Sequence, residues 1–145
     1  TRFLTSLGES VALVLYAFEN ARPGDLFVKK APAATIADLA AAVALVMGMK
    51  SPEITVIGTR HGEKLFESLL SREEMAKAED LGDYYRVPLD ARSLDYGLFV
   101  EDGEREVEEL TDYTSHNTVR LTIEETAEIL TSLPAMQKVL AEVRA

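Results

Sequence analysis

The residues best suited to chemistry form one charged loop, residues 58–67 with the sequence GTRHGEKLFE. Two glycines flank Arg60 and His61 and allow the backbone to turn tightly. The side chains of Arg60, His61 and Lys64 can donate to an anion, while Glu63 can accept hydrogen bonds from hydroxyl groups. These residue types predict binding of an anionic ligand rather than bond breaking. The alternative is that Arg60 is an ordinary solvated loop arginine.

The elements that must position this loop are predicted to be helices with a few short strands, an α/β class with the character of an α+β lobe. The β-branched run at 54–57 predicts a strand that leads into the loop, and 66–70 predicts a second strand or extended stretch. Capping residues, apolar spacing and proline or glycine stops predict the other elements. These are helices over 7–21, 35–48, 72–80, 122–130 and from Pro134, a strand at 26–28 and an edge strand at 84–89.

Length and composition predict one domain covering residues 1–145. The chain is 47% hydrophobic and contains no cysteine, so disulfides and thiolate chemistry are excluded. It has no apolar run of about 18 residues and no signal-peptide pattern, from which we expect no membrane partner and a cytoplasmic location.

The charge is strongly uneven along the chain. Residues 1–70 carry seven basic and seven acidic residues, whereas residues 71–145 carry eight basic and eighteen acidic, which accounts for the net charge of −10. This balance argues against a nucleic-acid partner. It also indicates that a small anion binds the first half. The acidic segment 101–112, with seven acidic residues and one basic residue, predicts a solvated loop or an oligomer contact.

Several familiar catalytic and cofactor motifs are missing from the sequence. There is no glycine-rich dinucleotide loop, no Walker loop and no tyrosine followed four residues later by lysine. His61 and His116 lack metal-ligand spacing, and Ser115 beside His116 is not a nucleophile and base pair. The sequence therefore predicts no catalytic residue, no cofactor-binding residue and no metal ligand in this chain.

Four strings occur in the order TRF at 1–3, GDLFV at 24–28, GTRHGEK at 58–64 and DYTSHNT at 112–118. Together they resemble the C-terminal part of extended short-chain dehydrogenase/reductases of bacterial polysaccharide biosynthesis. The resemblance is to the inverting UDP-N-acetylglucosamine 4,6-dehydratase/5-epimerases of capsule and O-antigen sugars. Similar proteins carry the name UDP-glucose 4-epimerase, and the two activities stay open alternatives here.

The resemblance implies that an N-terminal Rossmann domain, absent from this chain, carries NADP or NAD and the catalytic residues. This chain would be the UDP-sugar-binding lobe and inert in isolation. By the family pattern, Arg2 and Arg60 would bind the UDP diphosphate, and Glu63 would bind the ribose hydroxyls. His61 and Lys64 are secondary candidates, and Glu67 is expected to pair locally.

Such a lobe is expected to expose an apolar patch, which self-association as a homo-oligomer would cover. A non-enzymatic oligomerisation module is the competing hypothesis. In that hypothesis the acidic segment and the last helix form an assembly surface, and the Arg60 loop is structural.

Overall fold

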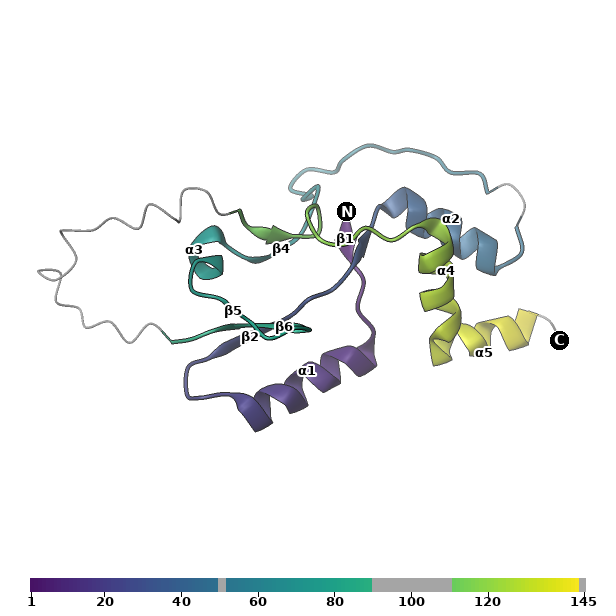
Figure 1. Cartoon of the computed structure of the whole chain (residues 1–145). Helices are drawn as coiled ribbons and strands as arrows, with labels where there is room; N and C mark the ends of the chain where they lie inside the picture. Colours follow the sequence, from purple (N-terminus) through teal and green to yellow (C-terminus); the bar gives the residue numbers. More distant parts are fainter. Residues whose placement is uncertain (50–51, 90–110, 144–145) are drawn as a thin grey trace, which may run out of the picture. The chain divides into compact units, whose positions relative to one another are not determined.

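The computed structural model describes residues 1–49, 52–89 and 111–143 (Figure 1). Within these ranges the chain forms helices and short strands, and the strands pair antiparallel in small sheets. The predicted mixed α/β class is confirmed. The chain divides into two compact units: unit 1 takes residues 1–6, 31–67 and 115–145, and unit 2 takes residues 7–30 and 68–114. Whether both make up the one substrate-binding domain expected from the sequence stays a prediction.

Unit 1 combines a two-stranded sheet with three helices. Strand β1 (Arg2–Phe3) pairs antiparallel with β3 (Ala33–Ala34), so that Arg2 lies opposite Ala34. The helices are α2 (Ile36–Val46), α4 (Ile123–Ser132) and α5 (Pro134–Val143). The predicted caps of α2 and α4 are confirmed. The Thr35 hydroxyl accepts the Asp38 N–H at the start of α2, and Thr122 forms a capping box with Glu125 at the start of α4.

The core of unit 1 is made of small side chains where α2 packs against α4. Ala42 and Ala44 of α2 are buried, as are Thr126 and Ala127 of α4. Small residues let two helix backbones approach closely, so the interface between α2 and α4 is packed without large side chains. Strand β3 pairs with β1 on one side and contacts residues 119–121 on the other, where the Ala33 N–H donates to the Val119 carbonyl and the Ala33 carbonyl accepts from the Leu121 N–H.

Unit 2 contains a three-stranded antiparallel sheet in the order β2-β6-β5. Its members are β2 (Leu26–Lys29), β6 (Tyr84–Val87) and β5 (Glu79–Asp80), and helix α1 (Leu7–Asn20) contacts β2. The Tyr16 ring of α1 stacks on Tyr84 with 4.3 Å between centroids and meets Phe27 edge-on. A second pair of strands, β4 (Ser68–Leu70) and β7 (Tyr113–Thr114), buries Leu70, and α3 (Arg72–Met75) follows β4.

Two predicted elements are wrong, and a third is a strand as predicted but not an edge strand. Residues 54–57 form no strand, and Val56 is 89% exposed, because β-branched residues favour a strand only when a neighbouring strand pairs with them. The helix predicted to reach residue 80 ends at Met75, because Glu79 and Asp80 pair with β6 instead. Strand β6 is the central strand of its sheet, not an edge; Pro88 lies just beyond its last paired residue and so removes no ladder bond.

The remaining predictions agree with the structure, or fall outside the described residues. Helix α1 begins at Leu7, Gly48 follows the C-cap of α2 with a positive φ of 71°, and α5 begins at Pro134. The sequence also gives the last helix an apolar face and leaves open whether the core or a partner chain covers it; no residue of α5 is buried, so the core does not. Most of the acidic segment, residues 101–110, lies outside the described residues.

Candidate functional site

The charged loop lines the wall of a groove within unit 1. The groove has a volume of about 870 Å³ and is bordered by Thr1 and Arg2, by the first turns of α2 and by residues 54–65. Its apolar lining comes from Ile36 and from Ile54, Val56 and Ile57, and its polar lining comes from the loop and from Arg2. The 54–57 stretch therefore supplies groove surface rather than a sheet strand.

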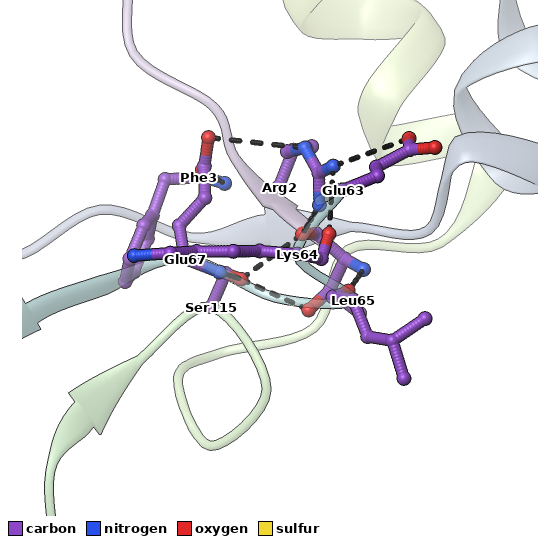
Figure 2. A network of polar contacts seen from close by, with 8 residues as sticks. Arg2, Phe3, Glu63, Lys64, Leu65, Glu67 and Ser115 are labelled. Atoms are coloured by element: carbon purple, nitrogen blue, oxygen red, sulfur yellow. Dashed lines mark hydrogen bonds and ion pairs between the residues drawn. The ribbon is translucent and has the colours of Figure 1, made fainter. Parts of the chain in front are cut away.

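The Arg2 guanidinium is held at the groove by two carbonyl groups and two carboxylates (Figure 2). Its Nη1 donates to the carbonyl of Thr1 at 2.8 Å, and its Nη2 donates to the carbonyl of Lys64 at 3.0 Å. The Glu63 carboxylate lies 3.7 Å from Nη2, and the Glu67 carboxylate lies 3.9 Å from Nε. The Arg2 side chain remains 28% exposed, so a fixed guanidinium faces the groove.

Glu63 shapes the loop and also neighbours Arg2. Its Oε2 accepts the backbone N–H of Arg60 at 3.0 Å, and its own N–H donates to the Arg60 carbonyl at 3.0 Å. Gly62 completes this turn with a φ of 78°, a conformation that side chains with a Cβ rarely adopt. A carboxylate offers about four acceptor positions, so Glu63 keeps capacity for ligand hydroxyl groups.

The other predicted binding side chains extend into solvent. Arg60, His61 and Lys64 are exposed, and within the described part of the chain their side chains make no hydrogen bond or ion pair. The structure thus brings all five predicted residues to one groove. Arg2 and Glu63 are pre-positioned, whereas Arg60, His61 and Lys64 are available cations or donors. The side chains of Arg2, Arg60 and Lys64 carry three positive charges against two negative charges, those of Glu63 and of Glu67 beside Arg2, which leaves these side chains with one net positive charge.

Two residues at the site were not among the predicted binders. Glu67, expected to pair locally, accepts the N–H of Phe3 at 2.9 Å and neighbours Arg2, both more than sixty residues away. The local expectation was wrong because β1 runs beside the end of the loop. Ser115 is fully buried and hydrogen-bonded to both Thr1 and Glu67. The DYTSHNT string contains Ser115, but a string alone does not give a contact 114 residues away.

One shifted pKa lies beside the site. Partial burial lowers the pKa of the Thr1 amino group, which donates to the Leu65 carbonyl at 2.7 Å, and the nearby Arg2 and Arg120 charges lower it further. Among residues 1–49, 52–89 and 111–143, no three His, Asp or Glu side chains are grouped to hold a metal ion. No helix in these ranges has the length and apolarity needed to cross a membrane.

Comparison with known proteins gives matches over nearly the whole chain. Residues 1–89 match the model of a family described as polysaccharide biosynthesis protein, and residues 90–137 match that described as polysaccharide biosynthesis protein C-terminal. A protein of Rickettsia canadensis named UDP-glucose 4-epimerase is 59% identical over 140 residues, and one of Rickettsia felis with the same name is 56% identical. Both alignments cover 97% of this chain but 41% of the relative, so the chain spans less than half the length of these proteins.

The fold is also found among solved structures. The structure titled X-ray structure of Pen from Bacillus thuringiensis matches with a TM-score of 0.68 and 23% identity, covering 93% of this chain and 38% of that one. At this identity the match concerns the fold alone.

Proposed function

Because this chain belongs to the polysaccharide biosynthesis protein family, we propose that it is the UDP-sugar-binding lobe of a nucleotide-sugar epimerase or dehydratase. The observation that carries the proposal is the groove in which Arg2 and Glu63 are fixed next to the free Arg60 and Lys64 side chains. The names of the rickettsial relatives support a UDP-sugar as the ligand.

In this proposal Arg2 and Arg60 bind the diphosphate of the nucleotide. Guanidinium groups pair with phosphate oxygens through two parallel hydrogen bonds, and the exposed Arg60 side chain is free to do so. Lys64 adds a point charge on the same loop. Glu63 accepts from the ribose hydroxyls with the oxygen capacity that its backbone bond leaves over. His61 is a secondary donor at the turn.

The residues of this chain do not fit a dinucleotide cofactor. The sequence has no glycine-rich phosphate loop and no tyrosine and lysine at the spacing of this superfamily. We therefore assign NADP or NAD, and the hydride chemistry it supplies, to a Rossmann domain elsewhere in the full-length protein. On this basis the lobe by itself binds UDP-sugar without converting it. The product of the full-length protein serves capsule or O-antigen polysaccharide synthesis.

Titration calorimetry of the full-length protein with UDP tests the proposal. Arg60→Ala removes charge-assisted hydrogen bonds of about 1.5–3 kcal/mol, so binding should weaken about tenfold or more. Glu63→Ala should weaken it as well, because both the loop turn and a ribose acceptor are lost. Arg22→Ala, at an exposed arginine of unit 2, is the matched control and should bind UDP normally. Unchanged affinity in both loop variants would refute the assignment.

The oligomerisation module is the second candidate, and one observation favours it. Helix α5, the last helix and part of the assembly surface in that hypothesis, has no buried residue, and its apolar Val139 and Val143 side chains are exposed. Light scattering with and without residues 101–112 separates the candidates. Only the module hypothesis requires that removing this acidic segment changes the assembly.

A further inference from the structure

The groove is built from two chain segments that are far apart in sequence. Arg2 lies on β1, whereas Arg60, Glu63 and Lys64 lie on the loop that ends at Glu67. A diphosphate held by Arg2 and Arg60 together requires a fixed spacing between these segments. The structure therefore needs a contact that joins the start of β1 to the end of the loop.

The Ser115 hydroxyl makes that contact with its one donor position and both of its acceptor positions. Its hydroxyl donates to the carbonyl of Thr1 at 3.1 Å and accepts the N–H of Glu67 at 2.9 Å. The Thr1 hydroxyl lies 2.9 Å away, and because the Ser115 proton is already used, Thr1 is the donor of this bond. The Ser115 N–H also donates to the Glu67 carbonyl at 2.8 Å. One buried hydroxyl thus joins both segments.

Both residues that Ser115 contacts, Thr1 and Glu67, also contact the Arg2 guanidinium (Figure 2). The Thr1 carbonyl that accepts from Ser115 also accepts from Arg2 Nη1. The Glu67 backbone that is paired with Ser115 carries the carboxylate that lies 3.9 Å from Arg2 Nε and accepts the Phe3 N–H. Moving Ser115 would displace two of the four groups that hold Arg2, the Thr1 carbonyl and the Glu67 carboxylate.

We infer that Ser115 is a positioning residue for nucleotide binding, an inference that rests on the proposed function. It touches no ligand and acts by setting the place of Arg2 relative to the Arg60 loop. Removal of the hydroxyl leaves the Thr1 carbonyl, the Thr1 hydroxyl and the Glu67 N–H each with one hydrogen bond fewer at a partly buried position. The two segments then separate more easily, and Arg2 loses its fixed orientation toward the groove.

The test is calorimetric titration of the full-length protein with UDP, using Ser115→Ala, Arg2→Ala and the double variant. Ser115→Ala should weaken UDP binding about tenfold, which is within the coupling range of groups in one hydrogen-bond network. In the Arg2→Ala background the same change should weaken binding less than about twofold, because the group it positions is gone. A purely structural role would not produce this dependence on Arg2.

The matched control is Thr126→Ala. Thr126 is also fully buried in unit 1 and its hydroxyl donates to a backbone carbonyl, that of Thr122 at 2.7 Å. This variant should lose stability but bind UDP normally. If Ser115→Ala fails to fold, Ser115→Cys keeps a side chain of similar shape with only weak hydrogen bonding and should weaken UDP binding about threefold.

The outcomes separate this inference from the proposed function. If Arg60→Ala and Glu63→Ala weaken binding while Ser115→Ala, or a folded Ser115→Cys, binds like wild type, the inference is overturned and the proposed function stands. Equal loss from Ser115→Ala with and without Arg2 also overturns it. If Arg60→Ala and Glu63→Ala have no effect, the proposed function fails and the inference fails with it.

Discussion

Replacing Glu67 with glutamine should strengthen UDP binding. The Glu67 carboxylate lies 3.9 Å from Arg2 Nε at the border of the groove, where it partly neutralises the charge that an anion would meet. Glutamine keeps an oxygen that can accept the Phe3 N–H, now held at 2.9 Å, so the local fold is preserved. The change therefore removes a repulsive charge and leaves the backbone arrangement in place.

The size of the gain follows from the distances. An anionic oxygen bound to Arg2 at about 3 Å would lie about 7 Å from the Glu67 carboxylate. With the dielectric constant of water, one unit charge at that separation is repelled by about 0.6 kcal/mol, and the two charges of a diphosphate by about 1.2 kcal/mol. Glu67→Gln should thus tighten UDP binding about sevenfold. We use the water value because the Glu67 side chain is 45% exposed.

Calorimetry at low and high salt is the assay. The gain should be present at about 0.01 M ionic strength and vanish near 1 M, where the Debye length falls to about 3 Å. Glu142→Gln, at an exposed position of α5 outside the groove, changes the net charge equally and should leave the affinity unchanged. The reasoning is refuted if Glu67→Gln binds UDP more weakly at low salt, or if Glu142→Gln tightens binding to the same extent.

Three further predictions concern stability. Leu70→Ala, at a side chain only 1% exposed, should lower the free energy of unfolding by about 2–5 kcal/mol in urea titrations; a loss below about 1 kcal/mol would contradict the assigned burial. The hydrogen bond from Lys30 holds the pKa of Asp80 below its ordinary 3.8, so Asp80→Asn should lower Tm at pH 7. The Tm difference between wild type and this variant should shrink as the pH falls through that lowered pKa. A constant Tm difference from pH 7 to pH 2 would contradict the pairing. Gly24→Ala should lower the free energy of unfolding more than Gly48→Ala in the same urea assay. Both glycines have a positive φ, which costs a residue with a Cβ about 1–2 kcal/mol, but of the two only Gly24 would bring the new Cβ within 2.8 Å of a leucine side chain. Equal losses in the two variants would contradict this prediction.

Local signals in the sequence predicted most helix starts and the strands β2 and β6, although not the central place of β6 in its sheet. The Thr35 and Thr122 caps act within three residues of themselves, and Pro134 fixes its own backbone angle, so these features do not depend on the rest of the fold. The predicted strand at 26–28 agrees with β2, in which Val28 is buried. Where a segment depends on a distant partner, as at 54–57 and at 76–80, the local pattern predicted the wrong element.

The sequence by itself determined which residue types could bind an anion and where the loop turns, because Gly62 and the bond between Glu63 and Arg60 are local features. It also placed Arg2 among the binders, through a family resemblance. Only the tertiary structure decided that Arg2 lies beside the carboxylates of Glu63 and Glu67. It also decided that Ser115 joins the start of β1 to the end of the loop. These contacts span from 48 to 114 residues, and hydrogen bonds over such separations form only once the chain has folded β1 against the end of the loop.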